Sequence, residues 1–561
     1  MLLGDIPSRN ALFYPEKTAV IEGRKRYTFA QFNERVNRLA NAICAMGLVE
    51  GDRMAVLNHN CFQYIELYLA AAKSGTPLVP LNFRFSPDEL AYVMNDSGAK
   101  AIFFGKDYVP SVESLKKDAP AIEHFICINA QLSGAENYDE IIVGSHAGEP
   151  ARRLDENDVA ILCYTGGTTG KPKGVMTTHR NVITSCYNTV VERELSNRDV
   201  FLNALPVFHA GGANSMFAFA FLGATNVFMS TSGIETILQT VEAHHVTDFV
   251  LVPTQIVSLL ENPHIGKYDL SSIKAIYYGT APISVEPLKK MMRLMKCKLS
   301  QTYGMTETFV PVSILKPEDH LLEGDPEEVQ RMGSAGRAVM GVKVKVVDDT
   351  GQEVETGRVG EIVVSGSNVM KGYWNLPELT REVLKNGWLH TGDMGKIDKL
   401  GYLYVVDRKK EMIISGGENI YAKEVEDVLS SHPEVSHAAV IGVPDDKWGE
   451  AVKGLVIREK GSQVSEKELI DFCKNRLANY KKPRSIEFPP GYPCRHACQR
   501  QDIVDDVPAL FMRGLGRQRR HRAGRKPAVD SHPDLLGSVA TTKRPGCRQI
   551  ARDDRIALRV L

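Results

Sequence analysis

The chain has 561 residues, more than a single hydrophobic core organises, so two or more domains are expected. Its 68 basic and 68 acidic side chains cancel, which removes any bulk electrostatic argument for a nucleic-acid or anionic-membrane partner. With 43% hydrophobic residues, the composition is that of a globular protein.

The cysteines and the N-terminus favour a reducing compartment. Of the ten cysteines, only Cys494 and Cys498 form a close pair, and scattered thiols are not typical of a disulfide framework. The first ten residues show no basic region followed by an apolar run, so no secretory signal is expected. The most apolar window, residues 215–229, is broken by Gly, Thr and Asn, which favours a buried helix–strand unit over a membrane span. The sequence therefore predicts a cytoplasmic protein without an integral membrane segment.

Residues 1 to about 400 alternate helical patterns with short apolar runs. Helices are predicted within 28–47 and 86–98, the second opening on Ser86 with Glu89 three residues on, which is a capping box. Strands are predicted within 53–58, 76–82, 100–105, 246–253 and 273–279. Alternation of this kind indicates parallel sheets with helices on both faces.

The pattern of predicted secondary structure changes after Gly341. Short β-rich segments separated by Gly and Asp turns predict a β subdomain at about 341–407. Residues 411–478 then combine strands and helices in a compact pattern. The fold class expected is therefore α/β: a large N-terminal domain of layered α/β sheets with a β subdomain over residues 1–408, and a small α+β C-terminal domain over 409–488.

The strongest chemical signal is YTGGTTGKPKG at 164–174, directly after the apolar run VAILC. Four glycines and three threonines after a strand predict a loop of backbone N–H groups and hydroxyls suited to polyphosphate, with two lysines adding charge. A Walker A loop is excluded, because Thr165 stands where that motif needs glycine and Pro172 where it needs Ser or Thr. The alternative is a Gly/Thr-rich turn without a ligand.

Residues 164–174 resemble the signature of the adenylate-forming (AMP-binding) superfamily, which includes acyl-CoA synthetases, luciferases and adenylation domains of peptide synthetases. Further segments resemble family motifs in the family's order; they are 203–209, 278–282, 301–308, 388–393 and 407–410. Thr280 departs from the pattern, because many members carry Gly there. The resemblance covers residues from near 10 to 488 and looks most like the acyl-CoA synthetases of the fatty-acid–CoA ligase type.

The resemblance implies ATP, Mg²⁺ and CoA as cofactor and cosubstrates, and it assigns roles by position. The implied catalytic residues are His209, Lys171, Glu307 and the hinge Lys410, about which the small C-terminal domain rotates. The implied ATP-binding residues are Thr165, Gly166, Gly167, Thr168, Thr169, Gly170, Lys173, Gly279, Thr280, Ala281, Pro282, Thr302, Tyr303, Gly304, Met305, Thr306, Asp393 and Arg408. CoA is implied to bind at Ser415, Gly416, Gly417 and Glu418, and the metal at Thr165 and Glu307.

These residue types suit the implied reaction. A carboxylate that attacks the α-phosphorus of ATP brings two anions together, so catalysis rests on positioning and charge neutralisation. Without the motifs, the simplest interpretation is that Glu307 is a surface carboxylate, Asp393 a turn residue and His209 an interior histidine. Their positions within the motifs favour a role in the reaction instead.

The end of the chain departs from the family. The family's C-terminal domain ends with a Gly-Lys segment shortly after the YKKPR run at 480–484, but only Lys526 and Lys543 follow Phe488 here. Codons for 499–503 read one base later permit Asn/Ser-Gly-Lys-Ile. We therefore interpret residues 489–561 as an aberrant Arg-rich tail, disordered or out of frame, which leaves the C-terminal domain truncated.

The sequence therefore predicts an acid–CoA ligase that forms acyl-AMP and then acyl-CoA, with adenylation impaired by the missing lysine. Apolar pocket candidates favour a fatty or aromatic acid; they are Phe208, Gly211, Gly212, Tyr278 and Met305. Two alternatives stay open: an acyl-AMP ligase serving a separate carrier protein, and a nucleotide-binding pseudo-enzyme. Small molecules are the expected partners, with no nucleic acid, and the oligomeric state is left open with a homodimer as candidate.

Overall fold

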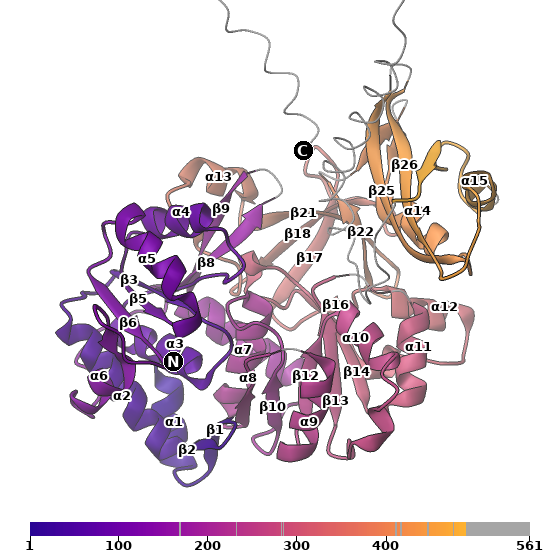
Figure 1. The fold of residues 1–561 in the computed structure, drawn as a ribbon. Helices are drawn as coiled ribbons and strands as arrows, with labels where there is room; N and C mark the ends of the chain where they lie inside the picture. Colours follow the sequence, from indigo (N-terminus) through magenta and orange to yellow (C-terminus); the bar gives the residue numbers. More distant parts are fainter. Residues whose placement is uncertain are drawn as a thin grey trace, which may run out of the picture. The chain divides into compact units, whose positions relative to one another are not determined.

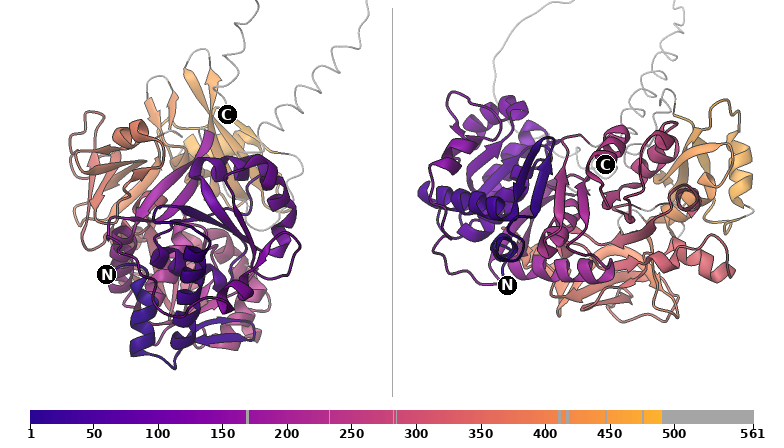
Figure 2. Two further views of the ribbon diagram at one scale, coloured as in Figure 1. Left: turned by 90° about the vertical axis from the view of Figure 1, so that its left-hand side faces the viewer. Right: turned by 90° about the horizontal axis from the view of Figure 1, so that it is seen from below.

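The computed structural model of the chain describes residues 1–489 except 168–169, 232, 282, 284, 410–411, 416–417, 446–447 and 475. The chain forms two compact units, one from Met1 to Met412 and a second that starts at Ile413. Figure 1 shows the elements of both units, and Figure 2 follows the same chain path from two further sides.

The first unit contains an eight-stranded sheet. Its order is β19 (Gly372–Tyr373), β9 (Gly170–Thr178), β8 (Val159–Gly167), β4 (Leu78–Pro80), β3 (Arg53–Leu57), β5 (Ala99–Phe104), β6 (His124–Cys127) and β7 (Glu136–Asn137). The strands from β8 to β7 pair in parallel, whereas β9 returns antiparallel to β8 and carries β19 on its other edge. The parallel core predicted over 53–105 is confirmed.

A nine-stranded sheet forms the second large layer of this unit. Its order is β16 (Arg337–Ala338), β15 (Ser313–Leu315), β14 (Lys298–Tyr303), β13 (Ala275–Gly279), β12 (Asp248–Leu251), β10 (Val200–Asn203), β11 (Thr225–Phe228), β1 (Thr18–Glu22) and β2 (Lys25–Thr28). Strands β14 to β1 run parallel, so their carboxyl ends meet at one edge, where ligand sites of α/β sheets form.

Helices cover both sheets, as the sequence predicts. They are α1 (Asp5–Phe13), α2 (Phe29–Ala45), α3 (Phe62–Ser74), α4 (Pro87–Ser97), α5 (Val109–Asp118), α6 (Tyr138–Val143), α7 (His179–Glu192), α8 (Ala210–Leu222), α9 (Ile234–His244), α10 (Pro253–Leu260), α11 (Val285–Leu294), α12 (Pro326–Gln330) and α13 (Pro377–Val383). Figure 1 shows α9, α10 and α11 beside β12, β13 and β14.

Local sequence explains where the helices start. Thr28 caps α2 and Ser86 caps α4, each with a capping box, and the box predicted between Ser86 and Glu89 is confirmed. The apolar window 215–229 forms the end of α8 followed by β11, as predicted, and is not a span. Among the residues that the structure describes, no helix combines the length and the apolar character needed to cross a membrane.

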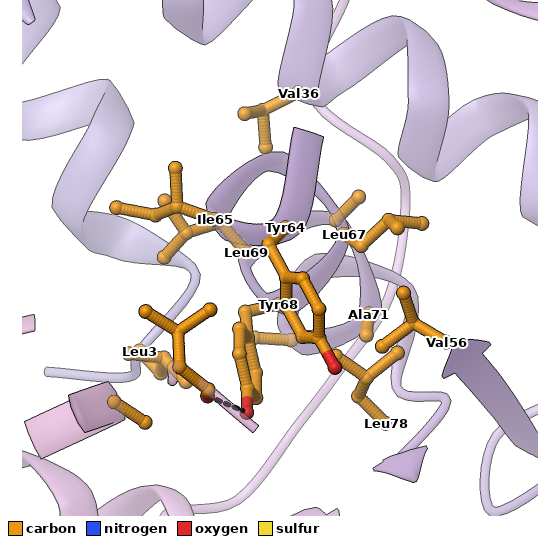
Figure 3. Close-up of a cluster of buried hydrophobic side chains, with 14 of the residues drawn as sticks. Leu3, Val36, Val56, Tyr64, Ile65, Leu67, Tyr68, Leu69, Ala71 and Leu78 are labelled. Atoms are coloured by element: carbon orange, nitrogen blue, oxygen red, sulfur yellow. Dashed lines mark hydrogen bonds between the residues drawn. The ribbon is translucent and has the colours of Figure 1, made fainter. Parts of the chain in front are cut away.

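The main core lies around α3, whose thirteen residues are all buried. Figure 3 shows Tyr64, Tyr68 and Leu67 of this helix among side chains from other elements. Burial of each such large side chain contributes about 2 kcal/mol. The same cluster includes residues of α2, α7 and α8 and of strands from both sheets, so the central helices pack the two sheets around one shared core.

The β subdomain is a separate five-stranded antiparallel sheet. Its order is β17 (Val342–Val347), β18 (Gly360–Gly366), β21 (Trp388–Ile397) and β20 (Leu384–Lys385), with β22 (Leu403–Arg408) on the other part of β21. Every strand here is antiparallel to its neighbours, which explains the short hairpins and Gly/Asp turns in the sequence.

The second unit is a small α+β fold. Its sheet has the order β24 (Glu418–Ile420), β23 (Ile413–Ser415), β26 (Gly449–Arg458) and β25 (Val435–Asp445), with β27 (Ser485–Glu487) parallel to β26. Helices α14 (Ala422–Ser430) and α15 (Glu466–Lys474) contribute Val425, Leu429 and Leu469 to its core. These elements match the strand and helix pattern predicted over 411–478.

Candidate active site

The Gly/Thr-rich segment forms a β-hairpin rather than the loop that the sequence predicted. Strand β8 continues through Gly167, β9 starts at Gly170, and Thr165 pairs with Lys173 across the ladder. The difference arises because the apolar run before the motif already sets an extended strand, and threonine favours continuing it. Thr165, Gly166 and Gly167 are therefore the last three residues of β8.

The base of this hairpin is fixed by packing against Asp96 at the end of α4. The Tyr164 hydroxyl donates to the Asp96 carboxylate (2.5 Å), and the Trp374 indole N–H donates to the Asp96 carbonyl oxygen (2.9 Å). A Cβ on Gly174 would lie 3.0 Å from the Tyr164 ring and 3.1 Å from Trp374. Glycine at 174 is therefore required by close packing, which the sequence interpretation had assigned only to phosphate contact.

Glu307 lies in the short 3₁₀ helix Thr306–Thr308, which packs against β9. The Tyr373 hydroxyl donates to Glu307 Oε1 (2.7 Å), and burial together with the Glu307 charge raises the pKa of Tyr373, so the phenol stays protonated. Lys173 Nζ lies 5.7 Å from the centre of the Tyr373 ring, and Lys171 Nζ lies 4.9 Å from that of Tyr92. The carboxylate and the Lys173 ammonium thus share one aromatic neighbour.

Asp393 is a buried carboxylate with two partners. It faces Arg408 across the β21–β22 ladder, and the Arg408 Nε atom lies 3.0 Å from its Oδ1. The Tyr303 hydroxyl donates to its Oδ2 (2.7 Å). Burial raises the pKa of Asp393, while Arg408 and Tyr303 favour the charged form. Only 4% of Asp393 is exposed, so the carboxylate has a fixed orientation suited to a pair of hydroxyl donors.

The segment after β13 brings the predicted adenine-side residues to the carboxyl edge of the sheet. A Cβ on Gly279 would lie 2.4 Å from the Thr302 carbonyl oxygen, so the two strand ends meet only because residue 279 is glycine. Thr280 follows with φ +69°, a left-handed conformation that is unfavourable for a β-branched residue. Its methyl group lies 3.9 Å from the Cβ position of Gly211 in α8, and Ala281 is partly buried beside it.

The segment after β14 crosses the same edge. Gly304 approaches Val310 so closely that an added Cβ would lie 3.0 Å from its Cα, and Met305 packs with the apolar cluster that contains Tyr373. Thr302 is different, because its hydroxyl accepts a hydrogen bond from Arg193 (2.9 Å). Since successive strand side chains point to opposite faces, the Thr302 side chain points away from that of Tyr303.

His209 stands at the N-cap of α8, and its ring lies 4.1 Å from the Phe208 ring, measured between centroids. The ring is accessible at the surface, yet surrounding protein removes part of its hydration, and this desolvation together with the Arg84 charge lowers the pKa of His209 to about 4. The imidazole is therefore neutral near pH 7.

Among the pocket candidates, Tyr278 is fully buried, and its hydroxyl forms a hydrogen bond of 2.8 Å with His320 Nε2.

Some predicted positions lie in the second unit or outside the described residues. In the second unit, Ser415 of β23 pairs with Glu418 of β24. The positions outside the described residues are Thr168, Thr169, Pro282, Lys410, Gly416, Gly417 and the tail from 490 onward.

The sequence analysis missed two residues that support the site, Tyr373 and Asp96, and for a third, Tyr303, it missed the partner. Tyr373 holds Glu307, and Asp96 anchors the hairpin through Tyr164. Tyr373 and Asp96 come from segments far in sequence from the residues they hold, and no motif marks either one, so only the tertiary fold brings them to the site. Tyr303 was assigned to nucleotide binding in general, without its bond to Asp393.

The described residues fit a nucleotide whose metal is carried mainly by phosphate oxygens. No group of three or more His, Cys, Asp or Glu side chains in the described part of the chain could hold a metal by itself. Glu307 retains one carboxylate oxygen beyond its Tyr373 bond and forms no ion pair with another described residue, so it can bind a hard cation. Glu307 and Thr165 would hold Mg²⁺, which would supply neutralisation of phosphate charge.

Two family models match the chain. The model described as AMP-binding enzyme matches residues 8–374, and the model described as AMP-binding enzyme C-terminal domain matches residues 424–493. The first match spans the hairpin, the β13 and β14 loops and Glu307.

Curated relatives and solved structures are similar over most of their length. A feruloyl-CoA synthase from Amycolatopsis sp is 39% identical over 490 residues, covering 87% of this chain and 94% of the relative. The long-chain-fatty-acid–CoA ligase FadD13 of Mycobacterium tuberculosis is 35% identical over 471 residues, covering 83% and 90%. The structure of Bacillus subtilis o-succinylbenzoate coenzyme A synthetase with ATP and magnesium ion superposes with a TM-score of 0.76 at 32% identity, covering 89% and 99%.

Proposed function

The chain belongs to the AMP-binding enzyme family and is an AMP-forming carboxylic acid–CoA ligase, and we propose that it activates an apolar fatty or aromatic acid. Its substrates and cofactor are the acid, ATP with Mg²⁺, and CoA. In the first half-reaction the acid carboxylate attacks the α-phosphorus, the C–O–P link of acyl-AMP forms and pyrophosphate leaves. In the second, the CoA thiol attacks the acyl carbon, the C–S bond forms and AMP leaves.

The observation that carries the ATP-dependent ligase reaction is the buried Asp393 carboxylate held between Tyr303 and Arg408. Two acceptor oxygens in a fixed plane suit the 2′- and 3′-hydroxyls of a ribose. Glu307 and the β8–β9 hairpin lie in the same compact unit, where they would bind the phosphates and their metal. Positioned charges of this kind act most strongly where water is excluded.

The residues near His209 support an apolar acid. Phe208 is buried and packs edge-on against Phe83 with ring centres 5.2 Å apart, while Gly211 keeps space open beside Thr280. The neutral His209 imidazole can accept or donate one hydrogen bond to the acid carboxylate without adding charge. The names of the relatives, a feruloyl-CoA synthase and a long-chain-fatty-acid–CoA ligase, point to the same two classes of acid.

We further propose that this polypeptide adenylates poorly and thiolates normally. The lysine that the family places after its YKKPR run has no counterpart shortly after residue 488, whereas Ser415 and Glu418 are present for the thiol step. Domain boundaries near 408/409 and 488/489, with Lys410 as hinge, belong to the same proposal. A frameshift near 488–492 explains the tail, and resequencing of codons 480–510 tests it directly.

The experiment measures both half-reactions with ferulate, octanoate and acetate as acids. Pyrophosphate exchange into ATP reports adenylation, and thioester formation from supplied acyl-AMP and CoA reports thiolation. Octanoate or ferulate active and acetate inactive supports the apolar acid. Thioester formation with CoA but not with a carrier protein rejects the acyl-AMP ligase alternative, and nucleotide binding without either half-reaction supports the pseudo-enzyme. A homodimer stays a prediction for sedimentation analysis.

A further inference from the structure

A cavity of about 630 Å³ lies in the first unit away from the β13 and β14 loops. Its lining includes the residues that open three strands or stand just before one: Asp199 before β10, Asp248 of β12, Ala275 of β13 and Lys298 of β14. Because these strands run parallel, the cavity opens at their amino ends, whereas Gly279 and the nucleotide segments lie at their carboxyl ends. The cavity is therefore distinct from the candidate active site.

Arg193, just after α7, is the unusual group of this cavity. Its guanidinium lies over the Tyr277 ring at 4.0 Å, and its two terminal nitrogens donate only to the hydroxyls of Thr302 (2.9 Å) and Ser215 (3.4 Å). Its Nε is buried and has no hydrogen-bond partner among the described residues. The ion pairs of the lining carboxylates Asp199 and Glu194 are made with lysines and not with Arg193. Loss of hydration lowers the pKa of Arg193, and the nearby Asp248 charge offsets only part of this effect.

The carboxylates that line the cavity are already engaged. The two oxygens of Asp248 accept hydrogen bonds from the hydroxyls of Tyr277 (2.8 Å) and Thr247 (2.5 Å). Lys298 forms an ion pair with Glu194 (3.0 Å), and Lys274 forms one with Asp199. Asp248 is thus bound by neutral hydroxyls, so its charge acts on Arg193 from nearby without forming an ion pair with it.

Counting the charged lining residues gives four cations and three anions, so the cavity carries a net formal charge of +1. The rest of the lining is mainly apolar and includes Leu195, Ile273, Met292, Met295 and Leu299. Methionine side chains adapt to ligands of different shape. A volume of about 630 Å³ is within the range of small-molecule sites.

From this combination we propose that the cavity is a second binding site for a small monocarboxylate with an apolar body, whose carboxylate pairs with Arg193. The ligand is of the same chemical class as the proposed acid substrate, but the inference rests on the cavity alone and not on the proposed function. The cavity is also connected to the candidate active site by hydrogen bonds. Arg193 donates to Thr302, and the next residue, Tyr303, donates to Asp393. Occupancy would thus alter nucleotide affinity.

The direct test is a crystal structure of the full chain soaked with 4-bromobenzoate, in which the bromine is located by its anomalous scattering. We expect a bromine peak in this cavity with the carboxylate on Arg193, and no peak there with the neutral 4-bromobenzamide. The position of the peak separates this site from the active site without any turnover, so failure of the proposed function would not affect the result.

An affinity measured in solution distinguishes a true binding site from binding at crystal concentration only. Calorimetry should show one more equivalent of 4-bromobenzoate bound by the wild type than by Arg193→Met, whose affinity at this site falls about tenfold or more because a charge-assisted hydrogen bond is lost. Arg198→Met, which removes a nearby exposed arginine outside the lining, should bind like the wild type. If Arg193→Met fails to fold, Met292→Trp, which fills the cavity from a half-exposed position, should also abolish binding.

Three results would overturn the proposal: no bromine peak in the cavity, equal occupancy by the amide, or an unchanged second equivalent in both folded variants.

Discussion

Replacement of Asp393 by asparagine tests the assignment of the ribose site without relying on turnover. The substitution keeps the shape of the side chain and the Tyr303 donor, but it removes the negative charge and turns one acceptor into an NH₂ group. Because 6% of the Asp393 side chain is exposed against 63% for Arg408, the carboxylate is the fixed partner and the arginine is screened by solvent. The loss should therefore appear mainly in nucleotide binding.

The magnitude follows from the bonds that Asp393 can make. A hydrogen bond to a charged acceptor contributes about 1.5–3 kcal/mol, and asparagine retains part of it, so a loss of about 2 kcal/mol is expected. That loss corresponds to an increase of about 30-fold in the Kd for AMP. Titration calorimetry with AMP measures it, and thermal unfolding confirms that the variant is folded. Asp349→Asn, at an exposed carboxylate, should leave the Kd unchanged.

The decisive comparison uses 2′,3′-dideoxy-AMP. In the wild type this analogue should bind more weakly than AMP by a similar factor, whereas in Asp393→Asn the two nucleotides should bind almost equally. If a folded Asp393→Asn variant still discriminates AMP from the dideoxy analogue as the wild type does, Asp393 does not contact the ribose.

Three further predictions concern the metal, acid stability and backbone strain. Glu307→Gln should raise the Mg²⁺ concentration for half-maximal ATP binding about tenfold, measured by calorimetric titration at a series of Mg²⁺ concentrations. An unchanged Mg²⁺ requirement would show that Glu307 does not bind the metal. Burial lowers the pKa of His179, which accepts a hydrogen bond from the Leu3 N–H, from 6.5 to about 4, so unfolded chains bind more protons between these values. The free energy of unfolding should then fall by up to about 3 kcal/mol as the pH drops from 6.5 to about 4, and it should level off below that range. Urea unfolding at a series of pH values should show a flatter pH dependence for His179→Gln than for the wild type. Equal pH dependence of the two proteins would contradict this prediction. Thr280→Gly should raise the unfolding free energy by about 1 kcal/mol by relieving the left-handed conformation, and a lower Tm would refute that strain.

The sequence alone was enough for the fold class and for most of the motif positions. Period-two and helical patterns predicted the parallel strands around 53–105, the β subdomain and the small second unit, because each element carries its own hydrophobic face. The capping box at Ser86 was readable for the same reason, since its bonds join residues three apart. The order of the motifs was sufficient to identify the family.

Tertiary structure decided which atoms meet. The sequence predicted a phosphate loop at 164–174, but pairing between Thr165 and Lys173 makes it a hairpin, because ladder partners depend on how the chain returns. Thr302 was grouped with Tyr303 by its motif, yet the pleat turns its hydroxyl to Arg193. Hydrogen bonds between distant segments, such as that from Tyr373 to Glu307, leave no local pattern, because only the packing of the eight-stranded and nine-stranded sheets brings the two residues within reach. Motifs thus determined what this protein does, and long-range packing determined which side chains hold the site in place.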